Sequence, residues 1–385
     1  MFFAVFYYYF VQINEPEAVP AFARKYRMSC KTCHSPFPKL KDYGDDFAGN
    51  GFVLTDEEAP RYFMDTGDEE LDLIRDVPLA FRLEGYAKYQ SITEKEVDLS
   101  TPYNLKLISG GALTDNVAYY FYFYLSEHGE VAGIEDAYFM FNNLFSSELD
   151  LYFGQFQVSD PLFKRELRLT YDDYLIYKYA VGESDISLAY DKGIMLTYGF
   201  ETGTDVIVEL INGNGLVEAD GFGTFDKDKY KCFAGRLSQD IGEYLRVGGF
   251  GYYGKEGPSV DTLAGVNEVS IFGPDATIAY EPVELNIQYL ERRDSDPTFQ
   301  DAEGDDIETR GIMSELIFLP HGDDSKWYAV GLYNYVETDL NDYKYSTGTI
   351  HLGHVYTRNI RFFVEYTYDL EYEEHQAVTG FVLAM

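Results

Sequence analysis

The sequence predicts a mainly β protein, a transmembrane-type antiparallel barrel of about 14 to 16 strands that follows a small helical unit at the N-terminus. From about residue 77 to the end, apolar and polar residues alternate with period two, as in strands with one apolar and one polar face. Tyr (36), Phe (29) and Gly (34) are abundant whereas Pro (13) is scarce, which is typical of strands and turns. No apolar run reaches the ~18 residues that a membrane-spanning helix requires.

The chain starts with an apolar run from Met1 to Val11, a length that suits the core of a signal peptide. An Ala-x-Ala pattern at residues 21–23 follows, just before Arg24. The usual basic segment before the apolar core is missing. We expect residues 1–23 to be an export segment that takes no part in the fold.

Residues 24–75 predict a small helical unit. Pro38 suits a first helical turn, and Asn50-Gly51 supplies an end. Between them, apolar residues spaced as on one helix face are Leu40, Tyr43 and Phe47. A second short helix is expected before residue 30.

A Cys-Lys-Thr-Cys-His motif at residues 30–34 carries the most specific chemistry. Two thiols three positions apart can form thioethers with the two vinyl groups of a porphyrin, and the adjacent imidazole can bind the iron. The motif therefore predicts one covalent c-type haem held by Cys30, Cys33 and His34. A redox dithiol would open a helix in a βαβ unit, and a zinc site needs four ligands; neither context is visible nearby.

A haem needs shielding from water, and apolar residues flank the motif. Those expected around the cofactor, or in an ordinary small core, are Phe22, Tyr26, Phe37, Leu40 and Phe47. For the sixth iron ligand we favour Met64, which follows His34 by 30 residues. The alternatives are an open site or one of the histidines at 128, 321, 351, 354 and 375.

Residues 76–385 are expected to form the barrel. Strand-like stretches separated by Gly, Asp and Asn clusters occur near 79–91, 103–113, 116–126, 131–142, 147–158, 185–200, 204–212, 227–239, 243–254, 265–280, 283–289, 310–319, 326–337, 347–357, 360–369 and 375–385. The alternative is a soluble all-β protein, a sandwich or a propeller, although no blade-length repeat is present.

The stretch from Ser159 to Tyr179 departs from the strand pattern and carries a basic cluster, Lys164, Arg165 and Arg168. Long insertions between strands are usually functional or disordered, and the apolar residues here argue against disorder. The segment is expected either to fold into the lumen as a constriction or to lie on the surface.

The net charge of −36 excludes nucleic acid as a partner, because no basic surface could neutralise phosphates. It also argues against docking on an anionic inner leaflet. A solvated acidic surface is the simplest interpretation. Cys232 stands apart from the motif and is expected to be a small buried residue.

Three short patterns follow the haem motif: Phe-Pro-x-Leu at 37–40, Gly-x-x-Phe at 44–47 and Asn-Gly-Phe at 50–52. With these, residues 22–52 resemble bacterial porin-cytochrome proteins, which join a short c-type haem domain to an outer-membrane β-barrel. Residues 154–165 are similar to part of that group. The chain departs from the pattern at its N-terminus and in its Leu-Ala-Met ending.

This resemblance implies an envelope protein in electron transfer, with Cys30, Cys33 and His34 as haem ligands. The expected function is an outer-membrane electron carrier, not an enzyme, with its haem domain periplasmic or within the barrel and a redox partner protein in the periplasm or envelope. The alternatives are a solute-diffusion porin with the haem domain as plug or anchor, and a soluble periplasmic β-rich haem protein.

Overall fold

The computed structural model describes residues 21–26, 28–54, 63–64, 66–68, 70–71, 73–75, 77–91, 97–131, 133–258, 265–300 and 306–385. The expected export segment, residues 1–23, therefore lies almost wholly outside the described residues. Its last three positions open a helix.

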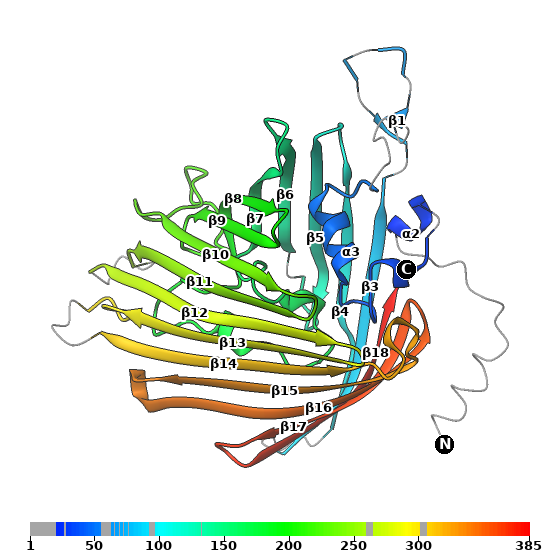
Figure 1. Ribbon diagram of the computed structural model, residues 1–385. Helices are drawn as coiled ribbons and strands as arrows, with labels where there is room; N and C mark the ends of the chain where they lie inside the picture. The colour runs from blue at the N-terminus through cyan, green and yellow to red at the C-terminus, as the bar shows by residue number, and fades with distance from the viewer. Residues whose placement is uncertain are drawn as a thin grey trace.

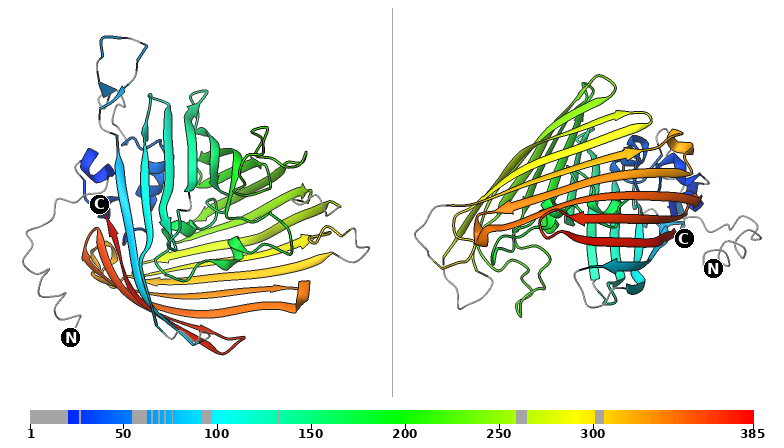
Figure 2. Two further views of the ribbon diagram at one scale, coloured as in Figure 1. Left: turned by 180° about the vertical axis from the view of Figure 1, so that it is seen from behind. Right: turned by 90° about the horizontal axis from the view of Figure 1, so that it is seen from below.

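Sixteen antiparallel strands form a closed barrel in which each strand pairs with the next along the chain and β18 pairs with β3 (Figures 1 and 2). This confirms the predicted fold class and excludes a sandwich or propeller. The strands are β3 (Leu79–Gln90), β4 (Val97–Ala112), β5 (Val117–Glu127), β6 (Gly133–Leu144), β7 (Leu149–Gln157), β8 (Tyr190–Phe200), β9 (Thr204–Ile211), β10 (Cys232–Ile241), β11 (Leu245–Glu256), β12 (Asn267–Tyr280), β13 (Val283–Asp294), β14 (Ile307–Phe318), β15 (Trp327–Thr338), β16 (Tyr343–Thr357), β17 (Ile360–Asp369) and β18 (Glu374–Ala384).

The strands bury their polar side chains and expose their apolar ones. In β17, Glu365 is 3% exposed whereas its neighbour Val364 is 51% exposed. In β16, His351 is fully buried and Ile350 is 64% exposed. A soluble sheet buries its apolar face, so this inversion is that of a barrel with a polar interior and an apolar outer surface.

The two ends of the barrel differ. At one end, which we call the short-turn end, connections include residues 201–203, 242–244 and 281–282. The opposite long-loop end carries connections that include 158–189 and 212–231. The chain enters β3 and leaves β18 at the short-turn end, where Phe81 and Met385 exchange backbone hydrogen bonds.

The N-terminal unit contains α2 (Ala21–Tyr26), the 3₁₀ turn η1 (Cys30–Thr32) and α3 (Asp42–Gly49). A small ribbon of β1 (Phe63–Met64) and β2 (Leu73–Ile74) follows. No helix in the described part of the chain is long and apolar enough to cross a membrane.

The helix predicted to start at Pro38 begins later than expected. The chain instead reverses direction between His34 and Leu40, which form an isolated antiparallel bridge, and α3 begins only at Asp42. The buried face of α3 consists of Gly44 and Phe47, while Tyr43 is 39% exposed. The expected apolar stripe therefore holds only at Phe47 and, partly, at Leu40.

The N-terminal unit occupies the mouth of the barrel at the short-turn end. Phe47 and Phe52 form one buried cluster with Ala118 of β5 and Met140 of β6, which face the lumen. Lysines of the unit also reach the far side of the mouth. Their ion pairs are Lys31 to Asp324 (3.1 Å), Lys39 to Glu284 (2.8 Å) and Lys41 to Asp323 (2.6 Å).

The long connection 158–189 folds into the lumen, with η3 (Arg165–Leu167) and α4 (Leu175–Lys178). Its apolar residues, among them Tyr177 and Ile186, pack against inward-facing strand residues in the largest buried cluster. Two arginines of the wall bond its backbone: Arg361 donates to the Leu169 carbonyl (2.8 Å) and Arg292 to that of Ile186 (2.6 Å). The Ser159 to Tyr179 segment thus lies inside the barrel and is not a surface loop. Cys232 is fully buried in the same cluster.

Candidate functional site

A cavity of about 230 Å³ lies where the N-terminal unit meets the barrel wall. It brings together all three motif residues and a largely apolar lining. The side chains that border it include Phe22, Met28, Cys30, Cys33, His34, Phe37, Leu40, Phe47, Phe52, Arg82, Lys106, Tyr120, Asp136, Asp160, Lys164 and Glu166. Most of this lining is apolar, which is the environment that keeps water from a bound haem.

His34 is held in one orientation by the turn that follows it. Its Nδ1 nitrogen lies 3.0 Å from the Pro38 carbonyl oxygen, which can only accept, so Nδ1 carries the proton. The Nε2 nitrogen of this tautomer has the free lone pair that an iron ligand needs, and a backbone carbonyl is a usual second partner of a metal-binding histidine. Burial lowers the pKa of His34 to about 4, so the imidazole is neutral at pH 7.

Cys30 and Cys33 lie at the two ends of η1. The Ser29 side chain accepts a hydrogen bond from the Lys31 amide, and the His34 amide donates to the Cys30 carbonyl (2.9 Å). Both cysteines are free thiols, and burial raises the pKa of each. Among the described residues no group of three or more His, Cys, Asp or Glu side chains is placed to hold a metal ion directly. The two thiols, the oriented imidazole and the apolar walls fit a covalent haem.

Four of the five predicted shielding residues line the cavity, namely Phe22, Phe37, Leu40 and Phe47. The fifth, Tyr26, lies behind Phe47, with ring centroids 5.5 Å apart, and donates its hydroxyl to the Phe52 carbonyl. Tyr26 therefore supports the lining and does not form it.

None of the candidates for the sixth ligand borders the cavity. Met64 is 50% exposed in the ribbon of β1 and β2, which extends away from the barrel in Figure 1. His351 is buried among the strands and bonded to Glu365 and Tyr328. Within the described ranges, Met28 is the methionine that borders the cavity.

Met64→Ala is therefore expected to leave unchanged the visible spectrum and the potential of a haem bound at the motif, because this side chain does not reach the cavity. Met28→Ala would enlarge the cavity and is expected to alter both the spectrum and the potential. Visible absorption and a redox titration of both variants check this. A change from low-spin to high-spin iron in Met64→Ala alone would contradict the placement.

Sequence reasoning missed several cavity residues. Phe52 stacks on Phe22 with ring centroids 4.9 Å apart and lies 5.8 Å from Tyr120 of β5. Phe52 belongs to the Asn-Gly-Phe pattern, and this pattern could have indicated that Phe52 lies near the motif. Tyr120 and Lys106 belong to strands, and only the register of the closed barrel shows that they reach the motif.

The predicted basic cluster is divided between two sides. Lys164 borders the cavity at the motif and pairs with Asp45 of α3 (2.6 Å). Arg165 and Arg168 turn away from it and pair with Asp173, at 3.0 and 3.5 Å. Of these three cluster residues, Lys164 is thus the one that faces the cavity at the motif.

The fold resembles that of outer-membrane porins. The chain is similar to the anion-selective porin from Comamonas acidovorans (TM-score 0.60, 11% identity, covering 80% of this chain and 99% of the porin). It is also similar to a loop L8 deletion mutant of the outer membrane protein OmpT of Vibrio cholerae (0.57, 14%, 80% and 99%) and to the channel DcaP of Acinetobacter baumannii (0.56, 14%, 80% and 97%). No protein-family model and no curated protein sequence matches the chain. At these identities the likeness shows the fold.

Proposed function

We propose that this chain is an outer-membrane barrel of porin type that holds one covalent c-type haem in its mouth and carries electrons. The observation that supports the proposal best is the cavity in which Cys30, Cys33 and His34 meet an apolar lining. Haem staining of the purified protein on a denaturing gel, together with its visible spectrum, tests it.

In this proposal Cys30 and Cys33 would hold the haem through thioethers, and Nε2 of His34 would bind the iron. The haem would supply a ferric–ferrous couple, and the protein would supply ligation, burial and position. Phe22, Phe37 and Phe47, which line the cavity, would shield the haem from water. Lys164 offers a positive charge to a propionate.

The outer membrane is the proposed location because the outer face of the barrel is apolar and the fold is that of porins. In outer-membrane barrels the short turns are periplasmic. The N-terminal unit lies at the short-turn end, so the haem would be in the periplasmic mouth. A redox partner protein would then approach from the periplasm.

A solute-diffusion porin, with the N-terminal unit as a plug, is the second candidate. The structural likeness to porins favours it more directly than it favours electron transfer. The packing of the lumen opposes it, since the 158–189 connection buries apolar side chains against the wall and the N-terminal unit fills one mouth.

Planar-bilayer recordings separate the two candidates. The intact protein is expected to conduct far less than the Comamonas porin measured in the same bilayers, because side chains fill its lumen. A deletion of residues 21–54 should raise the conductance only slightly, since the 158–189 connection stays in place. Large, steady channels from the intact protein would instead support solute diffusion.

A further inference from the structure

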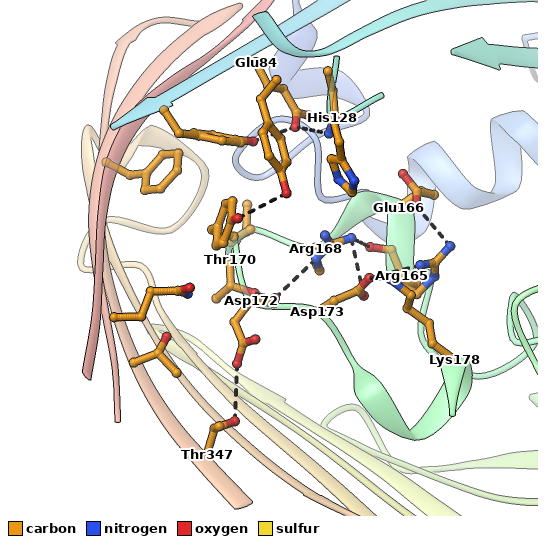
Figure 3. A pocket seen from close by; sticks show the side chains of 18 of the residues that line it. Glu84, His128, Arg165, Glu166, Arg168, Thr170, Asp172, Asp173, Lys178 and Thr347 are labelled. Atoms are coloured by element: carbon orange, nitrogen blue, oxygen red, sulfur yellow. Dashed lines mark hydrogen bonds and ion pairs between the residues drawn. The ribbon is translucent and has the colours of Figure 1, made fainter. Parts of the chain in front are cut away.

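A second cavity, of about 410 Å³, lies on the long-loop side of the barrel interior (Figure 3). Its volume is within the range of small-molecule sites. Side chains from β3, β4, β5, β16, β17 and β18 line it together with the 165–178 stretch of the inserted connection. Residues at the long-loop ends of the strands form its rim, among them Glu127, Asp369 and Glu374.

One wall of this cavity is aromatic. Tyr86 lies at ring-centroid distances of 4.8 Å from Tyr103 and 5.0 Å from Tyr171. The His128 ring continues the row at 4.4 Å from Tyr103. Tyr103 and Tyr171 are only half-buried. The Lys88 Nζ lies over both rings, 5.6 and 6.0 Å from their centroids. A planar ligand would stack on the exposed part of these rings, beside this cation.

The facing wall is cationic, although the chain as a whole is strongly acidic. Asp173 is shared by three cations: Arg165 at 3.0 Å, Lys178 at 3.2 Å and Arg168 at 3.5 Å. Glu166 is likewise shared, between Lys106 (2.7 Å) and Arg165 (3.3 Å).

These four cations meet two carboxylates, which leaves a local excess of positive charge. Arg168 and Lys178 keep part of their side chains exposed, at 21% and 46%. Among the other carboxylates nearby, Glu84 pairs with Arg82, and Asp172 accepts hydrogen bonds from Asn334 and Thr349. Three further carboxylates that line the cavity, Glu127, Asp369 and Glu374, lie at its rim. The positive excess is therefore limited to the inner wall around Arg168 and Lys178.

The two cavities share a wall, because Arg82, Lys106 and Glu166 border both. An aromatic contact also runs between them. The His34 ring lies 5.2 Å from that of Phe37, which packs against the cluster of Tyr86 and Phe363. A molecule in the polar cavity would thus be one layer of side chains from the haem cavity.

We propose that the polar cavity binds a planar aromatic molecule that carries acid groups, stacked on Tyr103 and Tyr171 and paired with Arg168 and Lys178. Binding does not depend on the haem. A second step, electron exchange with the haem across the shared wall, rests on the proposed function. A quinol of this class releases two electrons and two protons, so it reduces two ferric haems, one in each of two protein molecules, and becomes the quinone.

The probe is anthraquinone-2,6-disulfonate, with uncharged menadione as its comparison, titrated calorimetrically into the detergent-purified holoprotein. The disulfonate is expected to bind more tightly than menadione. The double variant Arg168→Gln/Lys178→Gln is expected to lose about tenfold or more in affinity, because two charge-assisted contacts disappear. Tyr103→Leu is expected to weaken binding through loss of stacking.

The matched control is Arg310→Gln/Lys344→Gln, which removes two exposed, ion-paired cations at the same end of the barrel. It should bind as the parent does. Equal affinity of the parent and the Arg168/Lys178 variant, or equal affinity for menadione and the disulfonate, would overturn the proposal.

A second experiment tests electron exchange. The reduced disulfonate is mixed with the protein, and reduction of the haem is followed by stopped-flow absorbance. Reduction is expected to be fast in the parent and slower in the Arg168/Lys178 variant at low probe concentration. Cys30→Ala/Cys33→Ala should still bind the oxidised probe. If the protein carries no haem, the stopped-flow experiment and the proposed function fail. The calorimetry still tests whether the polar cavity binds the probe.

Discussion

Cys30→Ala/Cys33→Ala is expected to abolish covalent haem staining of the protein on denaturing gels. Each thiol provides one thioether in the proposed site, and both border the same cavity as His34. Each single variant keeps one thiol and should give a reduced yield of stained protein. Gel staining with a peroxidase reagent, normalised to total protein, measures the effect.

Cys232→Ala is the matched control, since it removes the remaining cysteine. Cys232 is fully buried in the lumen, packed in the cluster of the inserted connection and away from the mouth. Its replacement should leave the staining at the parental level. Undiminished covalent staining in the double variant would refute the haem assignment.

Gly44→Ala is expected to lower haem occupancy and to destabilise the N-terminal unit by about 1–3 kcal/mol. A Cβ at this position would lie 2.4 Å from the Cys33 carbonyl oxygen and 2.9 Å from Cδ2 of Leu40. Glycine permits α3 to pack directly on the backbone of the haem motif. Forcing them apart would move Cys33 and the adjacent His34.

Gly49→Ala provides the comparison within the same helix, because a Cβ there meets nothing within 4 Å. That variant should match the parent or gain a few tenths of a kcal/mol from helix propensity. The haem-to-protein absorbance ratio and the thermal loss of visible circular dichroism report on both variants. If Gly44→Ala and Gly49→Ala behave alike, the close packing of α3 on the motif has no role in holding the haem.

The alternation of residue types was enough to predict the barrel, but not every strand end. β4 begins at Val97, earlier than expected, and its extra length contains Pro102. A proline normally argues against a strand. It is tolerated here because the register shifts between Glu84 and Tyr86 of β3, which leaves an irregularity opposite it. Such a compensation depends on the partner strand and is not visible in the segment itself.

The site was predictable where the indications were local. The spacing within residues 30–34 and the apolar neighbours up to Phe47 identified most of one wall of the cavity. Met64 was chosen from its distance along the chain, and the structure places it outside the cavity. The opposite wall, with Lys106 and Tyr120, comes from strands that meet the motif only when the barrel closes.

The basic cluster shows that sequence neighbours can also be separated by the local backbone. Lys164, Arg165 and Arg168 are neighbours in sequence and were expected to act together. The 3₁₀ turn η3 rotates Lys164 to one side and the arginines to the other. Residue type predicted the charge, whereas the local backbone decided which cavity received it.

The seam between β3 and β18 sets an order of events in assembly. The wall of the mouth is complete only when the last strand has paired with the first, and the contact of Lys31 with Asp324 joins residues 293 positions apart. Contacts this distant in sequence form late in folding. The wall residues Lys106 and Tyr120 border the motif only in the closed barrel. We therefore expect the N-terminal unit to take its final position in the mouth after this seam has formed.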